Sequence, residues 1–302
     1  MPSDIIAKML ENRTAIITGG ASGIGLETTK KFKQDSNYTT IYTVDKNPSV
    51  CGLYLCDDFV RPVQLDLRER ETVNTFVQEV LKRNGRIDAL VNGAVVLNVG
   101  RVETYYDENG RPTPEYQELL ATDYIAPLRL MKLVLPIMRR QGSGVIINVT
   151  STKEYVQDPY HVPYADLKAK LSRVSRKISS NERANGVRIT TLQPGNTKTN
   201  IDSGLWTPES NEKEAFEVQS LNDWWRDVFG NNPKNVANVI YKIAEGDITD
   251  ERVLVGIDAK PSFIMHDYVP YWDKLFSLGY KSALILTRLS LAIRNKPRAN
   301  LS

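Results

Sequence analysis

The sequence predicts a doubly wound α/β fold, in which one parallel sheet of about seven strands carries helices on both faces. Short apolar runs alternate with longer amphipathic stretches along most of the chain. These runs are almost continuous in Ile, Val and Leu, which is typical of parallel strands that helices cover on both sides. The 302 residues contain no internal repeat and no Pro/Gly/Ser-rich linker. We therefore expect one domain with a single sheet.

The predicted elements alternate regularly from the first strand onward. The apolar runs predict strands at 14–18, 40–44, 62–65, 88–91, 144–149, 187–192 and 252–255. The amphipathic stretches predict helices at 23–34, 69–84, 115–140, 161–184 and 233–246. Right-handed crossovers between parallel strands place these helices on both sides of the sheet.

Composition excludes several classes of protein. Thirty-nine Lys and Arg residues against 36 Asp and Glu give a net charge of +3, too balanced for a nucleic-acid-binding surface. Cys51 and Cys56 cannot build a disulfide framework and lack the second Cys/His pair of a zinc site, so no metal is expected. The N-terminus carries Asp4 and Glu11 instead of a signal peptide's apolar core, and no run reaches the ~18 apolar residues of a membrane span. These features favour a cytoplasmic protein.

A glycine-rich loop connects the first strand to the first helix, with the sequence Gly19-Gly20-Ala21-Ser22-Gly23-Ile24-Gly25. Glycines let the backbone approach a pyrophosphate, which the helix N-terminus stabilises. Asp45 ends the next strand about 20 residues on, where a carboxylate can accept both hydroxyls of an adenosine ribose. Asp45 would repel a 2′-phosphate and Ser22 is uncharged, so the sequence predicts NAD. Lys46 could reach a phosphate and keeps NADP as the less favoured alternative.

Ser151, Tyr164 and Lys168 are the candidate catalytic residues. Tyr164 and Lys168 are four residues apart and share one face of the helix predicted at 161–184. A free tyrosine titrates near ~10, and a neighbouring cation favours its phenolate. Ser151 lies shortly after a predicted strand, where it can hydrogen-bond a substrate oxygen. This set suits proton exchange between Tyr164 and an alcohol or carbonyl oxygen.

Through these motifs the sequence resembles the short-chain dehydrogenase/reductase family, whose phosphate loop reads T-G-x-x-x-G-x-G, over about residues 12–258. The resemblance implies a Rossmann-like fold and an NAD-dependent oxidoreductase that interconverts a secondary alcohol and a ketone, with Tyr164 as general acid/base. It also implies a set of cofactor-binding residues. These are Gly19, Ser22, Gly23, Ile24, Gly25, Asp45, Asp66, Leu67, Asn92, Ala94, Tyr164, Lys168, Pro194, Gly195, Thr197 and Thr199.

One departure from the family pattern follows the fourth strand. The segment Asn92-Gly93-Ala94-Val95 matches the family at Asn92 and Ala94 but not at Gly93 and Val95. Val95 adds bulk at a position that is normally glycine beside the cofactor. This departure contributes to a competing hypothesis, in which the chain is a catalytically weak or silent dinucleotide-binding scaffold.

Asp123 is a second departure, because the family often has an asparagine there whose main chain helps hold a water beside the lysine. If only the backbone carbonyl matters, an aspartate can take this catalytic position. If the carboxylate points inward, it should pair with Lys168, weaken the effect of that cation on Tyr164 and shift the working pH upward.

Residues 1–260 are expected to form the dinucleotide-binding catalytic domain, with a substrate loop at about 196–230, and 261–302 a C-terminal helical extension. Trp206, Trp224 and Trp225 in that loop favour an apolar or ring-bearing alcohol or ketone, although the loop could equally be an irregular helix packed on the core. Residues 272–294 form an amphipathic pattern that could cover the substrate mouth, form an oligomer contact or, less favoured, lie on a membrane surface. The family commonly pairs through helices corresponding to 115–140 and 161–184, which implies a homodimer or homotetramer.

Overall fold

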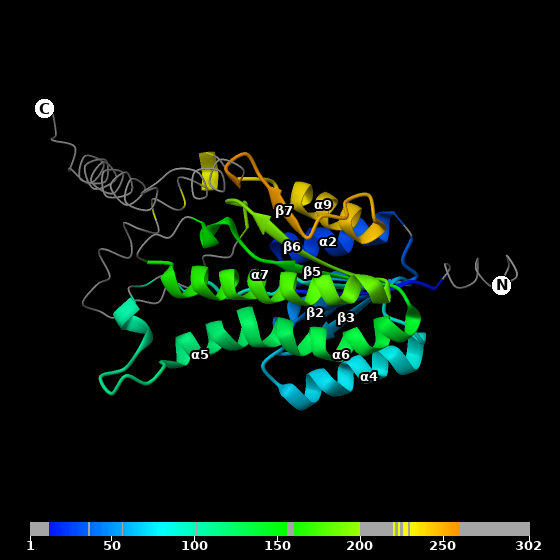
Figure 1. The fold of residues 1–302 in the computed structure, drawn as a ribbon, viewed down its shortest axis with the longest axis horizontal. Coiled ribbons are helices and arrows are strands. Elements are labelled where there is room, and N and C mark those ends of the chain that lie inside the picture. Colours follow the sequence, from blue (N-terminus) through cyan, green and yellow to red (C-terminus); the bar gives the residue numbers. More distant parts are fainter. Residues whose placement is uncertain are drawn as a thin grey trace, which may run out of the picture.

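Seven parallel strands form a single sheet in the order β3-β2-β1-β4-β5-β6-β7 (Figure 1). The computed structural model describes residues 12–259, except 36, 56, 99, 101, 156–159, 200–219, 221–222, 224–225 and 229. The strands are β1 (Thr14–Thr18), β2 (Thr40–Asp45), β3 (Val60–Gln64), β4 (Ala89–Asn92), β5 (Gly144–Val149), β6 (Val187–Pro194) and β7 (Arg252–Val255). The strand order reverses direction next to β1, as in a doubly wound fold, and the predicted fold class is confirmed.

Helices cover both faces of the sheet (Figure 1). They are α2 (Gly23–Gln34), α3 (Ser49–Leu53), α4 (Arg70–Asn84), α5 (Pro114–Leu120), α6 (Ala126–Gln141), α7 (Val162–Glu182) and α9 (Pro233–Glu245). Ile16 packs in the cluster that contains residues of α4, α6 and α7, whereas Ile17 packs in the cluster that contains residues of α2 and α9. Neighbouring residues of a strand point to opposite faces. Because helices cover both faces, Ile16 and Ile17 must both be apolar, and this explains the continuous apolar runs of the strands.

The helix predicted at 115–140 is interrupted by one turn of π-helix, Ala121–Ile125, between α5 and α6. In this turn the backbone N–H of Ala126 donates to the carbonyl of Ala121, five residues earlier. Asp123 lies in the turn and is fully buried. Single π turns inside helices are frequent at functional sites.

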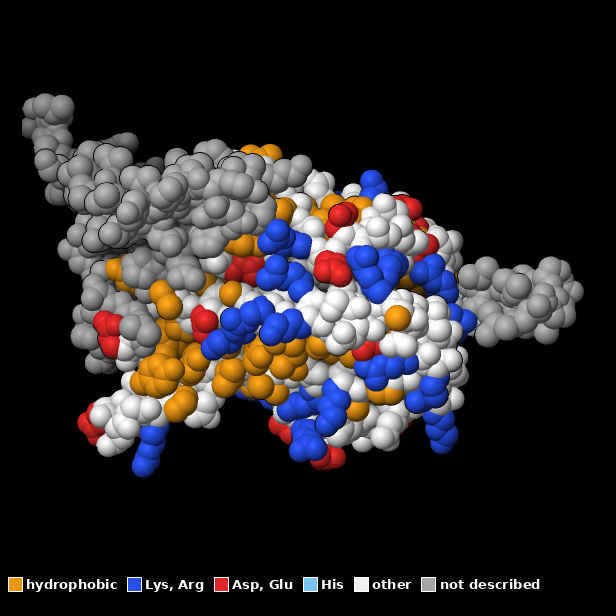
Figure 2. Space-filling view, viewed as in Figure 1, with side chains coloured by type: hydrophobic (Ala, Val, Ile, Leu, Met, Phe, Trp, Pro, Cys, Tyr) orange, Lys and Arg blue, Asp and Glu red, His pale blue; other side chains and the backbone are white. Residues whose placement is uncertain are grey.

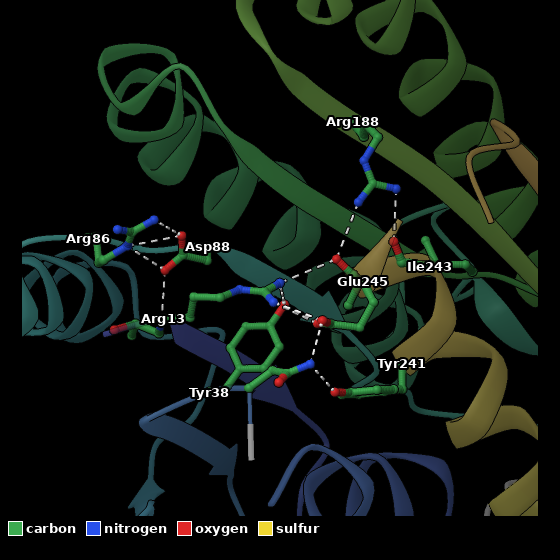
Figure 3. Close-up of polar contacts among 11 residues, drawn as sticks. Arg13, Tyr38, Arg86, Asp88, Arg188, Tyr241, Ile243 and Glu245 are labelled. Atoms are coloured by element: carbon green, nitrogen blue, oxygen red, sulfur yellow. Dashed lines mark hydrogen bonds and ion pairs between the residues drawn. The ribbon is translucent and has the colours of Figure 1, made fainter. Parts of the chain in front are cut away.

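A polar network ties the amino ends of β1 and β6 to the end of α9 (Figure 3). Arg13 donates to Glu245 at 2.9 Å and to the hydroxyl of the fully buried Tyr38 at 2.6 Å. Its guanidinium also lies 4.2 Å from the centroid of the Tyr38 ring. Arg188 of β6 donates to the carbonyl of Ile243 at 2.9 Å. The network braces one edge of the sheet and leaves the opposite, carboxyl edge for a ligand site.

Several predictions lie outside the described residues. They concern Trp206, Trp224 and Trp225, most of the substrate loop, and the extension at 261–302. Among the residues that the structure describes, no helix is long and apolar enough to cross a membrane. The same part of the chain holds no group of three or more Cys, His, Asp or Glu side chains that could bind a metal ion.

Candidate active site

Most of the predicted site residues lie at or just beyond the carboxyl ends of β1 to β6, and the others lie in the π turn and on α7. These ends meet at one edge because the strands are parallel and in register; Asn92 of β4, for example, is paired with Asn148 of β5. Ligands of doubly wound folds bind at this edge, beside the point where the strand order reverses. Here that point lies between β1 and β4.

The glycine loop forms a cradle that larger side chains would fill. Gly19 has a φ of +78°, and a Cβ atom there would lie 2.8 Å from the carbonyl oxygen of Gly93. Gly23 has a φ of +52°, and its Cβ would lie 2.9 Å from the Thr199 methyl group. A Cβ on Gly25 would lie 2.1 Å from the carbonyl oxygen of Gly19. The loops after β1, β4 and β6 therefore meet only because these residues are glycines, and the exposed backbone at the start of α2 fits a pyrophosphate.

Asp45 faces this loop from the end of β2. Its carboxylate accepts the backbone N–H of Ala21 at 3.0 Å and that of Asn47 at 2.9 Å. Ser22 is the N-cap residue of α2, and the Ile24 side chain is partly buried against the core. The carboxylate is thus held beside the phosphate loop, where it can accept ribose hydroxyls.

Asp66 lies beside a cavity of about 600 Å³ that adjoins Asp45 along the chain. The cavity is lined by Lys46, Asn47, Pro48, Gln64, Leu65 and Asp66. Hydrogen bonds from Arg68, one of them 2.6 Å long, hold the pKa of Asp66 below its usual value. Leu67 points elsewhere, because its side chain is buried in the core and its carbonyl accepts from Arg129 at 2.9 Å.

Asn92 and Ala94 take different places in the loop after β4. The buried side chain of Asn92 donates to Oδ1 of Asn148 at 2.7 Å and so ties β4 to β5. The backbone N–H of Ala94 donates to the hydroxyl of Thr18 at 3.1 Å, which anchors this loop on β1. Val95 packs on the apolar cluster that includes Tyr164.

Ser151, Tyr164 and Lys168 are brought together, although they come from different elements. Ser151 lies after β5, where its hydroxyl accepts the backbone N–H of Lys153 at 3.1 Å and lies close enough to Tyr164 to lower the pKa of the phenol. Lys168 extends its ammonium to 5.5 Å from the centroid of the Tyr164 ring and donates to the carbonyl of Val149 at 3.3 Å. All three residues are buried.

The carboxylate of Asp123 points inward, which was the second of the two arrangements considered from the sequence. Its Oδ2 lies 3.1 Å from Nζ of Lys168, and its Oδ1 accepts the backbone N–H of Val96 at 2.8 Å. Burial raises the pKa of Asp123, against the effects of Lys168 and Val96. Burial also raises the pKa of Tyr164, and the negative charge of Asp123 adds to that increase, while the neighbouring Ser151 side chain opposes it.

The turn after β6 carries Pro194, Gly195, Thr197 and Thr199 and is held by Asp258, a residue that the sequence reasoning missed. The Asp258 carboxylate accepts the backbone N–H of Asn196 at 2.9 Å and its side-chain amide at 3.0 Å. A Cβ on Gly195 would lie 1.9 Å from this carboxylate. An acidic residue directly after the last strand was the available signal.

The model of the family described as short chain dehydrogenase matches residues 13–210. The chain belongs to the short-chain dehydrogenase/reductase family. This short-chain dehydrogenase/reductase is 32% identical to one from Talaromyces verruculosus over 212 residues, which cover 70% of this chain and 79% of that relative. It shares its fold with the crystal structure of a short-chain dehydrogenase from Streptomyces avermitilis, with a TM-score of 0.71, 21% identity and coverage of 95% and 98% of the two chains.

Solved structures of the same fold contain either form of the cofactor. ElxO with NADP bound has a TM-score of 0.65 at 22% identity, covering 81% of this chain and 96% of that one. The 4-hydroxyisoleucine dehydrogenase complexed with NADH has a TM-score of 0.66 at 20% identity, covering 81% and 97%. As a member of this family, the short-chain dehydrogenase/reductase described here is an oxidoreductase with a nucleotide-binding Rossmann fold.

Proposed function

We propose that this protein is an NAD-dependent alcohol dehydrogenase or carbonyl reductase that interconverts a secondary alcohol and a ketone. The observation that carries the proposal is the buried group of Ser151, Tyr164 and Lys168 beside a glycine cradle. The position of Ser151, which lowers the pKa of the Tyr164 phenol, supports a site in which both hydroxyls bind one substrate oxygen.

The roles of the residues follow from this chemistry. A bound nicotinamide dinucleotide supplies the hydride carrier. The Ser151 hydroxyl orients the substrate oxygen, an effect worth several powers of ten in rate. Tyr164 accepts the hydroxyl proton when the alcohol is oxidised and returns it when the carbonyl is reduced. The Lys168 ammonium favours the phenolate, and the Asp123 carboxylate beside it weakens that effect.

The choice of NAD over NADP rests on Asp45. Two backbone N–H groups hold its carboxylate beside the phosphate loop, where it accepts ribose hydroxyls and repels a 2′-phosphate. Lys46, the residue that could favour NADP, is paired with Glu118 at 2.7 Å. Tighter binding of NADPH than of NADH would overturn this preference.

An apolar or ring-bearing substrate is supported by the surroundings of Tyr164. Its ring belongs to an apolar cluster rich in aromatic side chains, which includes Leu97, Tyr105, Leu119, Tyr160 and Leu167. Such a lining favours a hydrophobic alcohol or ketone over a small polar one. A panel of secondary alcohols of increasing apolar size tests this, with kcat/KM expected to rise along the series.

A homodimer or homotetramer that pairs through α5, α6 and α7 is supported by the surface. An apolar band runs over α5 and between α6 and α7 (Figure 2). Tyr106 and Ile125 are 43% and 39% exposed in this region. Large exposed apolar patches mark contacts between proteins. Sedimentation of Ile125→Asp should show a lighter species than the wild type; equal masses would contradict this interface.

Attachment of the same enzyme to a membrane surface through the C-terminal residues remains a prediction. Its support is the amphipathic pattern at 272–294 and the basic residues Arg294, Lys296 and Arg298. Co-sedimentation of the full chain with anionic and with neutral vesicles tests it. If the chain binds neither kind of vesicle, two roles are left for the helix predicted at 272–294: covering the substrate mouth or forming an oligomer contact.

The activity itself is tested by measuring NADH formation with a panel of secondary alcohols, for the wild type and for Tyr164→Phe. Turnover by the wild type alone supports the proposal. NADH binding without turnover of any substrate would favour the scaffold hypothesis, for which the pairing of Asp123 with Lys168 is the supporting observation.

A further inference from the structure

Two cations contact one carboxylate oxygen, that of Glu118, beside the carboxyl end of β2. The ammonium of Lys46 lies 2.7 Å from Oε1 of Glu118, and a guanidinium nitrogen of Arg68 lies 3.2 Å from the same atom. Lys46 directly follows Asp45, and Glu118 belongs to α5. Residues from the loops after β2 and β3 are thus joined through a residue from a third element.

The cluster is accessible from the cavity beside Asp45. Lys46 and Asp66 line that cavity of about 600 Å³, and Arg68 is bonded to Asp66. The side chains of Lys46 and Arg68 are 55% and 42% exposed, while that of Glu118 is 29% exposed. A ligand in the cavity can therefore contact Lys46 and lies beside the Asp66 carboxylate that holds Arg68, while Glu118 is less exposed than either cation and contacts both.

The arrangement has the chemistry of a phosphate site. A guanidinium and an ammonium that converge on one point bind phosphate oxygens well, because arginine offers a planar pair of donors and lysine a point charge. In this protein the Oε1 atom of Glu118 occupies the position where the two cations converge. A phosphate monoester that entered would have to displace Glu118 or accept its repulsion.

We propose that Glu118 is a built-in anion that fills a latent site for the 2′-phosphate of a dinucleotide, and that it thereby strengthens the preference against NADP that Asp45 establishes. The inference rests on the proposed binding of the adenosine ribose at Asp45. Glu118 pairs with Lys46 and, together with Asp66, with Arg68, the two cations that would attract the phosphate, and it adds its own charge to that of Asp45. A dinucleotide without the 2′-phosphate has no group at this site, so its affinity does not depend on the charge of Glu118.

The test compares the dissociation constants of NADH and NADPH, measured by cofactor fluorescence on the full chain. Glu118→Gln should tighten NADPH binding about tenfold, since Lys46 loses its carboxylate partner and Arg68 keeps only Asp66, and should leave NADH within about twofold. Glu115→Gln is the matched control: it makes the same charge change on α5, and Glu115 forms no ion pair with Lys46 or Arg68 among the described contacts. Adding Lys46→Met to Glu118→Gln should remove most of the gain.

Two results would overturn the inference. One is an unchanged NADPH affinity in both Glu118→Gln and a second variant, Glu118→Ala. The other is an equal gain in Glu118→Gln and Glu115→Gln, which would reflect net charge alone. The cofactor preference of the wild type tests the proposed function separately, because the effect of Glu118 is measured as a change in the NADPH to NADH ratio.

Discussion

The carboxylate of Asp123 lies 3.1 Å from the ammonium of Lys168, and both side chains are almost completely buried. The pair places a negative charge close to Tyr164, whose pKa is raised first by burial and then by Asp123. Glu154 acts in the same direction, whereas the neighbouring Ser151 side chain lowers the pKa of Tyr164. The phenolate that alcohol oxidation requires is therefore harder to form than it would be beside Lys168 alone.

Replacing Asp123 by Asn should move alcohol oxidation to lower pH. Removing the negative charge lowers the pKa of Tyr164, so the rising limb of the kcat/KM profile shifts downward and activity at neutral pH increases several-fold. The asparagine oxygen can still accept the N–H of Val96. The pH profile of kcat/KM measures the effect. Asp58→Asn, an exposed carboxylate, should leave the profile in place; an unmoved profile for Asp123→Asn would count against the electrostatic role.

Tyr164→Phe should reduce kcat by a factor of about 10² to 10⁴, the usual value of a general acid/base. The phenyl ring keeps its place in the apolar cluster, so the cofactor should bind with nearly the wild-type affinity. Steady-state kinetics and NADH fluorescence titration measure the two effects. A parallel loss of NADH binding would indicate that the substitution damages the site rather than the proton transfer.

Gly19→Ala should weaken cofactor binding, because the new Cβ would lie 2.8 Å from the carbonyl oxygen of Gly93 at a φ of +78°. Gly85 is a matched control, since it has a φ of +74° and open space around it. Both alanine variants should lose about 1–2 kcal/mol of stability from the left-handed backbone. Only Gly19→Ala should raise the Kd for NADH, by roughly tenfold or more; equal Kd values in the two variants would contradict the cradle.

Arg13→Met should destabilise the fold without changing kcat. It leaves the fully buried Tyr38 hydroxyl without the donor that lies 2.6 Å away, a loss of about 1–3 kcal/mol. The network (Figure 3) lies at the amino ends of β1 and β6, whereas the candidate site lies at the carboxyl ends of the strands. Urea unfolding measures the loss. Lys30→Met, which breaks an exposed ion pair with Glu27, should cost less than about 1 kcal/mol, and a similar cost in both variants would argue against the network.

Local patterns determined the fold class. Each strand is a run of apolar residues that both faces of the sheet require, as Ile16 and Ile17 illustrate. Gly19 of the cradle directly follows β1, and Gly23 and Gly25 lie in the first turn of α2. The spacing of Tyr164 and Lys168 predicted a shared helix face, and the structure places them on α7 with the ammonium near the ring. Such features depend on neighbours within a few residues, which a sequence displays directly.

Only the tertiary structure decided which charges meet. The sequence left the direction of the Asp123 side chain open, and a π turn between two helices points it at Lys168. Glu118 meets Lys46 across 72 residues, and Asp258 meets Asn196 across 62. Contacts between residues this far apart in the sequence depend on how separate elements pack, because the sheet as a whole sets the position and direction of each element. The sequence by itself therefore determined the family and the candidate catalytic residues, and the packing determined the electrostatic partners that tune them.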